Sequence, residues 1–235
     1  MKKRVVEGLL AVFCIGMLAA GCGVKAVESA AEAETVVSEE VDKDEPVEAG
    51  GTVLDVENLT KEQQNMLAVM DSLNMCMVEN DYSFDAADPQ FFWSALFYTI
   101  GNYHDLRDNE GDGMITCDYE SGYMKVFYRL VQEYASGIFE EYEDLPEIPE
   151  GCPVTLDEDT EYYDFMMGDR GMSYGKIVSW TEYEDGTNLV ETQLLDPSDE
   201  TIIADYQYVL VENSYAEGIT DPMFTYTVRS AEKVQ

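Results

Sequence analysis

Apolar residues recur at helical spacing in three segments between residues 60 and 142. The first segment opens with the capping-box pattern Thr60-Lys61-Glu62-Gln63 and predicts a helix that ends near residue 80. The second opens with Asp88-Pro89 as N-cap and first-turn proline and closes at Gly101. The third stripe predicts a helix over 121–142. The stripes comprise Met66, Leu67, Met70, Leu73 and Met77; Phe92, Trp93, Leu96, Phe97 and Ile100; and Met124, Phe127, Leu130, Val131, Tyr134 and Ile138.

After residue 153 the pattern changes to short runs rich in β-branched and aromatic residues. Asp185-Gly186 predicts a hairpin turn, and Asp196-Pro197-Ser198-Asp199 predicts another. In the run 201–211, alternate residues from Ile202 to Leu210 are apolar and share one face, with Asp205 and Gln207 opposite. The predicted strands are 162–166, 174–183, 187–195, 201–211 and 224–229, with a further short strand over 114–117. We therefore expect an α+β fold in which three N-terminal helices pack on a C-terminal antiparallel meander of four to five strands.

Residues 1–21 have the layout of a secretory signal peptide. Lys2, Lys3 and Arg4 precede an apolar run that is shorter than the roughly 20 residues of a membrane-spanning helix. Leu18-Ala19-Ala20-Gly21-Cys22 resembles the lipobox of bacterial lipoproteins, with Ala19 where that family more often has Leu. The resemblance implies cleavage before Cys22 and fatty acids, such as palmitate, on Cys22. The implied location is the extracytoplasmic face of the cell membrane; the alternative is an unlipidated secreted protein.

Residues 22–58 differ in composition from the rest of the chain. They hold 11 acidic and two basic residues and lack aromatic side chains. Such a segment buries too little apolar surface to offset its ordering entropy, so we expect a lipid-bearing Cys22 followed by a disordered acidic tether. Residues 59–235 have the length of one domain with its own core.

In the order of its elements, the region 60–230 resembles the NTF2-like cone fold. In that fold, helices close one side of a bent sheet and leave a pocket. The whole chain is also similar to small lipoproteins of Gram-positive anaerobes, a family with no known activity, so the resemblance implies no catalytic residues.

The sequence is strongly acidic, with 49 acidic and 13 basic residues and a formal net charge of −36. The predicted domain 59–235 holds 37 of these acidic residues and 8 of the basic ones. Nucleic acid and anionic lipid both select Lys and Arg. We therefore expect no nucleic-acid partner, and membrane contact through the N-terminal lipid alone.

An acidic loop supplies the one candidate metal site. Asp108, Glu110 and Asp112 occupy positions 1, 3 and 5 of a segment with glycine at position 6, which resembles an EF-hand calcium loop. Position 12 is Tyr119, and the glutamate of that motif, if it is Glu120, comes one residue late. The predicted ligands are therefore Asp108, Glu110, Asp112 and Glu120, and the alternative is an acidic connector with no cofactor.

Other polar features favour structural roles. Gly168-Asp169-Arg170-Gly171 is typical of a tight turn with a surface Asp–Arg pair, although Arg170 is also suited to binding a carboxylate. His104 is the only histidine, and its place after the second helix favours a surface position stabilised by the helix dipole. The odd number of cysteines in the domain leaves at least one thiol free and permits at most one disulfide among Cys76, Cys117 and Cys152.

Two functions fit these observations. The first is a non-enzymatic surface lipoprotein that binds a protein partner or small ligand through the sheet and its loops. The second is a hydrolase-type enzyme with acidic residues in a cone-shaped pocket, with or without calcium. An apolar pocket with converging carboxylates would favour the enzyme, whereas a filled core would favour binding.

Overall fold

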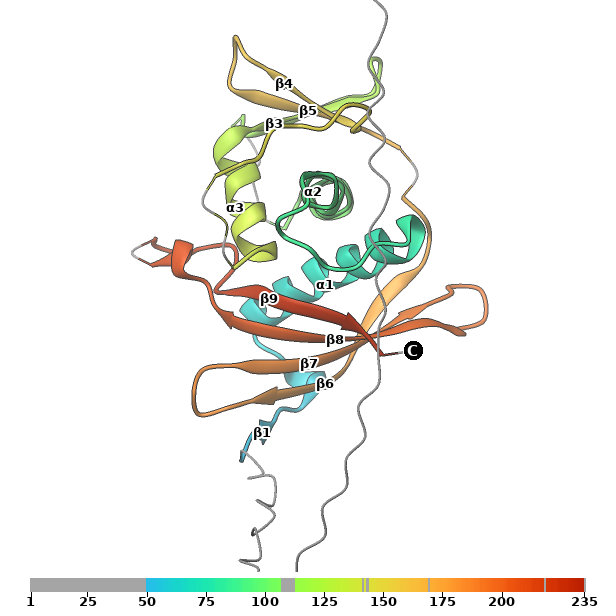
Figure 1. The fold of residues 1–235 in the computed structure, drawn as a ribbon, viewed down its shortest axis with the longest axis vertical. Helices are drawn as coiled ribbons and strands as arrows, with labels where there is room; N and C mark the ends of the chain where they lie inside the picture. Colours follow the sequence, from blue (N-terminus) through green and yellow to red (C-terminus); the bar gives the residue numbers. More distant parts are fainter. Residues whose placement is uncertain are drawn as a thin grey trace, which may run out of the picture. The chain divides into compact units, whose positions relative to one another are not determined.

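Three α-helices lie between two antiparallel sheets in the part of the chain that the structure describes (Figure 1). The computed structural model describes residues 50–106, 113–140, 142, 144–168, 170–217 and 219–234. Residues 47–235 form one compact unit. The α+β class is confirmed, but the helices are not all N-terminal and the strands divide into a five-stranded and a four-stranded sheet.

Helix α1 (Lys61–Asn80) has the predicted boundaries. The Thr60 hydroxyl accepts a hydrogen bond from the Gln63 N–H at 3.3 Å, and the Gln63 side chain accepts one from the Thr60 N–H at 2.9 Å. This reciprocal pair is the predicted capping box. Asp81 ends the helix in the left-handed conformation, with φ of 55°.

Helix α2 (Pro89–Tyr103) begins where the sequence predicts it, because the Asp88 side chain accepts from the Gln90 N–H at 2.9 Å. It continues two residues beyond the predicted end at Gly101. The glycine is thus inside the helix, where its lack of a side chain has a packing role described below.

The predicted helix over 121–142 is wrong in its first part. Strands β2 (Ile115–Asp118) and β3 (Tyr123–Phe127) form a hairpin there, with Gly122 at φ of +76° in the turn. Met124 and Val126 are buried while their neighbours in β3 are more exposed, which is the period of a strand. Helix α3 is confined to Tyr128–Ile138.

The five-stranded sheet has the order β1-β6-β7-β8-β9. Its last four strands form the predicted meander, and Gly186 adopts φ of +84° in the predicted hairpin turn. At the next hairpin, the Asp196 N–H donates to the Thr201 carbonyl at 2.9 Å. The strands of this meander are β6 (Tyr174–Glu182), β7 (Asn188–Leu195), β8 (Ile202–Glu212) and β9 (Tyr226–Lys233), and the 3-10 turn η2 (Ser214–Ala216) precedes β9.

The ordered domain begins before the predicted boundary at residue 59. Strand β1 (Thr52–Val53) pairs with the edge of β6, and the 3-10 turn η1 (Val56–Asn58) follows it. The Leu54 N–H donates to the Trp180 carbonyl at 2.8 Å, which extends this pairing. Residues 50–58 are therefore part of the domain rather than of the tether.

The four-stranded sheet has the order β2-β3-β5-β4. Strand β5 (Tyr162–Met166) was predicted, whereas β4 (Val154–Asp157) was not. Helix α2 packs against this sheet, with the rings of Trp93 and Tyr163 at 5.2 Å between centroids.

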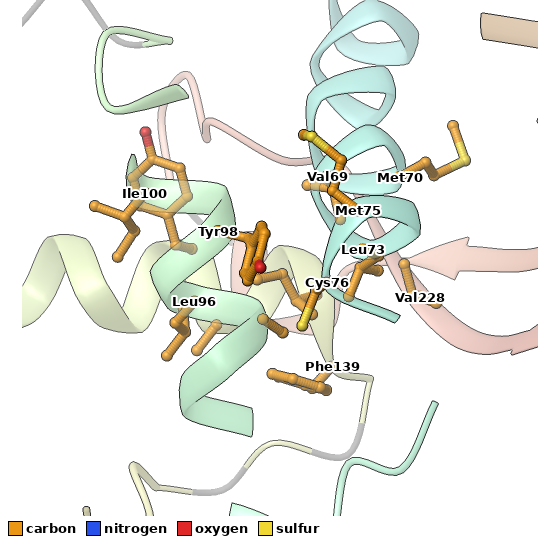
Figure 2. Close-up of a cluster of buried hydrophobic side chains, with 14 of the residues drawn as sticks. Val69, Met70, Leu73, Met75, Cys76, Leu96, Tyr98, Ile100, Phe139 and Val228 are labelled. Carbon is orange, nitrogen blue, oxygen red and sulfur yellow. The ribbon is translucent and has the colours of Figure 1, made fainter. Parts of the chain in front are cut away.

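The core fills the space around the helices. Figure 2 shows Leu73 and Cys76 of α1 facing Leu96 and Tyr98 of α2, with Phe139 at the end of α3 beside them. Leu73, Cys76 and Leu96 are completely buried. Among the described residues, no helix has the length and apolar character needed to cross a membrane.

Candidate functional site

The side of the five-stranded sheet that faces α1 is closed by side chains. Helix α1 contacts strands β6 to β9, and its residues Met66 and Met70 are completely buried. Deeper in the layer, the Tyr208 hydroxyl donates to Asn74 at 2.6 Å, and the Asn74 amide donates to the Thr192 hydroxyl at 3.0 Å. These buried polar groups satisfy one another, so this layer has the character of a core rather than of a ligand pocket.

Asp71 is the buried carboxylate of this layer. It accepts a hydrogen bond from the Tyr103 hydroxyl, and a side chain on Gly175 would come within 2.7 Å of its other oxygen. Burial raises the pKa of Asp71, while the Tyr103 hydrogen bond opposes that rise. The backbone of β6 fills the space beside the carboxylate. Asp71 of α1 therefore contacts both β6, at Gly175, and α2, at Tyr103.

The prediction that Arg170 forms a surface ion pair is wrong. Arg170 is only 8% exposed, and its guanidinium lies 4.2 Å from the centroid of the Phe97 ring. It donates to the Met166 carbonyl at 2.8 Å and to the Gly168 carbonyl at 3.3 Å. Burial lowers the pKa of Arg170. Arg170 thus attaches the segment between β5 and β6, which joins the two sheets, to α2. The prediction that Gly171 is a turn glycine is confirmed by its φ of +88°.

Of the four predicted calcium ligands, Asp108, Glu110 and Asp112 lie outside the described residues, as does Cys22. Glu120 is exposed in the β2–β3 turn, where its N–H donates to the Asp118 carboxylate at 2.9 Å. The described residues contain no group of three or more His, Cys, Asp or Glu side chains arranged to hold a metal. The calcium site stays a prediction.

The remaining candidate residues have structural positions. His104 caps the C-terminus of α2, as predicted, but it is partly buried rather than fully at the surface. All three cysteines of the described domain are free thiols. Cys76 is completely buried, and burial raises its pKa to about 12, so its thiol is inert at neutral pH.

The opposite face of the five-stranded sheet, turned away from α1, carries an open groove of about 340 Å³. Side chains alternate between faces along a strand, so Asp205 lies on this face while Tyr206 and Tyr208 are buried towards α1. We call this feature the outer groove. Its lining consists of Val178, Glu191, Gln193, Ile202, Asp205 and Val234, together with Thr192 and Tyr206, whose side chains are buried on the α1 side. A volume of this size suits a small molecule or a few side chains of a partner.

Two β-bulges shape the outer groove. At Val178, β6 has one residue more than β7, and at Ile203, β8 has one residue more than β7. Each extra residue bends its strand and redirects nearby side chains. Val178 is 44% exposed, and Ile202, which the sequence predicted on the buried face with Ala204, is 53% exposed.

Two carboxylates lie among these apolar side chains. Ser179 donates its hydroxyl to Glu191, and Gln193 donates its amide to Asp205, each at 3.0 Å. Gln193 pairs with Asp205 across β7 and β8, so Glu191 is the diagonal neighbour of Asp205. The Cα atoms of such neighbours are typically roughly 7–8 Å apart. The second oxygen of each carboxylate has no hydrogen bond to a described residue, and the groove lining contains no basic side chain.

A second hollow has a volume of about 460 Å³, and Ile203, the residue after Ile202 of the outer groove, is part of its lining. Its lining consists of Met172, Ser173, Asp196, Pro197, Ser198 and Ile203. Met172 is 79% exposed. Both hollows include residues that flank or form the β7–β8 hairpin: Ile202 in the outer groove, and Asp196, Pro197, Ser198 and Ile203 in the second hollow.

Nothing in the comparisons names a family. No family model matches the chain, and neither a curated protein nor a solved structure is significantly similar to it.

Proposed function

We propose that the chain is a lipoprotein of the extracytoplasmic membrane face, whose domain binds another molecule through the outer groove and has no catalytic role. The observation that carries the proposal is the outer groove itself, an apolar hollow with two carboxylates on a sheet face that no described element covers. The N-terminal motif ending at Cys22 supplies the expected anchor.

The filled core supports binding over an enzyme in a cone-shaped pocket on the helix side, and the two carboxylates of the outer groove lie on an open sheet face rather than converging in an enclosed pocket. On the helix side of the sheet, Asp71 is held between Tyr103 and the backbone of Gly175. A hydrolase that uses two carboxylates needs space between them for the substrate and water. The layer around Asp71 is occupied by buried side chains, and its polar partners are hydroxyls and amides rather than a second carboxylate.

The anchor is tested by metabolic labelling with a fatty-acid analogue. We expect the wild-type chain to be labelled and membrane-bound, and Cys22→Ser to be unlabelled and released. Labelled Cys22→Ser protein, or an unlabelled wild type, would contradict the lipid anchor.

Binding is tested in intact cells with a photo-crosslinking amino acid at single sites. At Ile202 we expect a discrete adduct. At Leu156, which is 45% exposed on β4, we expect none, so it serves as the matched control. Equal adducts at both positions, or none at Ile202, would contradict a binding role for the outer groove.

A further inference from the structure

From the outer groove, we infer that the partner is a basic segment of another protein, which places an aliphatic side chain in the groove and a Lys or Arg on each of the two carboxylates. This inference rests on the proposed function and adds the chemistry of the partner.

The carboxylates are available for such a contact. Each is held on one side only, Glu191 by Ser179 and Asp205 by Gln193, so the side chains are oriented while one oxygen stays open. A charged donor on an open carboxylate oxygen makes a stronger hydrogen bond than a neutral donor.

Apolar side chains flank the two carboxylates. Val178, Ile202 and Val234 are between 44% and 60% exposed, so covering them removes apolar surface from water. A ligand that is cationic at two points and aliphatic beside them satisfies both parts of the groove. A purely apolar ligand would leave the two carboxylates desolvated without partners, which is costly.

Charge also excludes two other occupants. A second copy would bring another domain with 37 acidic and 8 basic residues against the same acidic groove. The chain's own segment 22–49, with nine acidic and two basic residues, would be repelled in the same way. Lys176 lies on the same face, opposite Gln193 in the sheet, and is not part of the groove lining.

The test uses a short peptide, Lys-Val-Lys-Val-Leu, with blocked ends and a neutral dye; when extended, its two Lys lie about 7 Å apart, which matches the spacing of Glu191 and Asp205. In an extended peptide the two Lys and the Leu share one side. Binding to the full chain in neutral detergent is followed by fluorescence anisotropy at physiological salt. We expect the peptide to bind the wild-type protein saturably. A control peptide with Glu in place of both Lys should not bind.

The deciding comparison is between two double variants that remove the same charge. Glu191→Gln with Asp205→Asn keeps the hydrogen-bond acceptors of the groove, and we expect it to weaken binding by about fivefold or more, as two exposed ion pairs allow. Glu158→Gln with Asp159→Asn removes two exposed carboxylates at the β4–β5 turn, and we expect less than about a twofold change. Ile202→Ser is also expected to weaken binding.

Equal weakening by both double variants would mean non-specific attraction to an acidic protein and would overturn the inference. Absence of saturable binding to the wild type would overturn it as well. So would a dimer in sedimentation that Ile202→Ser dissociates, because the groove would then hold a second copy. If crosslinking at Ile202 in cells persists while the peptide test fails, the proposed binding function survives and only the basic partner is excluded.

Discussion

The guanidinium of Arg170 lies over the ring of Phe97, at 4.2 Å from its centroid, in a space that exists because residue 101 of α2 has no side chain. A Cβ at Gly101 would come within 2.0 Å of the guanidinium carbon. The contact joins the link between β5 and β6 to the helix layer, and so ties the two sheets to one another.

We expect Gly101→Ala to lower the free energy of unfolding by about 1–3 kcal/mol, because the added methyl group displaces Arg170. The loss should occur although Ala favours helix over Gly by about 1 kcal/mol. Urea unfolding measures it, with Gly168→Ala as the control, since a Cβ there has no atom within 4 Å. In an Arg170→Ala background the cost of Gly101→Ala should largely vanish; an unchanged cost would show that the guanidinium is not the obstacle.

Removing the Tyr208 hydroxyl should cost about 1–2 kcal/mol, because Asn74 then loses a buried hydrogen-bond donor. Tyr208→Phe tests this by chemical denaturation. Tyr206→Phe is the matched control on the same face of β8, since the Tyr206 hydroxyl has no hydrogen bond to a described residue. Equal losses in the two variants would contradict a specific role for the Asn74 contact.

The buried carboxylate Asp71 predicts a pH dependence of stability. Burial raises its pKa above the usual 3.8, so the folded chain keeps this proton at pH values where the unfolded chain has lost it. Stability from this group is therefore present below the unfolded pKa and is lost as the pH rises through the folded pKa. In Asp71→Asn the amide carries no charge at any pH, so this variant lacks the pH-dependent cost of burying a carboxylate.

The stability of Asp71→Asn relative to wild type should therefore increase as the pH rises above about 4 and become constant above the folded pKa. Each unit of pKa difference is worth about 1.4 kcal/mol. Denaturant unfolding between about pH 4 and pH 8 measures this. A stability difference that does not change with pH would show that Asp71 has the same pKa in the folded and unfolded states.

The three thiols of the domain should differ in reactivity. Cys76 is completely buried with its pKa raised to about 12, whereas Cys117 and Cys152 are partly exposed. We expect iodoacetamide followed by peptide mapping to label Cys117 and Cys152 in the native protein and Cys76 only after unfolding. Rapid native labelling of Cys76, or a Cys117–Cys152 pair that reacts only after reduction, would contradict the structure.

The elements that were predictable from sequence are those specified by local chemistry. The capping box at Thr60 and the Asp88-Pro89 start fix helix beginnings through contacts three residues away or fewer, and the Asp185-Gly186 turn does the same for a hairpin. The third helix was predicted too long because Met124 and Phe127 match the helical i, i+3 spacing, whereas the side chains that β3 buries are Met124 and Val126, which are two residues apart. Strands β1 and β4 are too short to leave a periodic signal.

The candidate site was much less predictable. The alternation of polar and apolar residues along β8 correctly predicted Asp205 on the outer face. It wrongly predicted Ile202 on the buried face, because the alternating pattern does not reveal the bulge at Ile203. The burial of Arg170 depends on Gly101, which is distant in sequence, and a glycine near the end of a helix is typically a terminator. Both features arise from contacts between segments far apart in the chain.

Strand β1 also decides how the domain responds to mechanical load. Its two residues are the first of the sheet along the chain from Cys22, so a pull on the N-terminal segment reaches the folded domain at the Thr52–Glu182 and Val53–Thr181 pairs. Peeling β1 away would bare the edge of β6, and an unpaired edge is a template for a further strand. If the N-terminal segment carries the proposed lipid anchor, tension on it would act first on the β1–β6 pairs and would leave the edge of β6 unpaired.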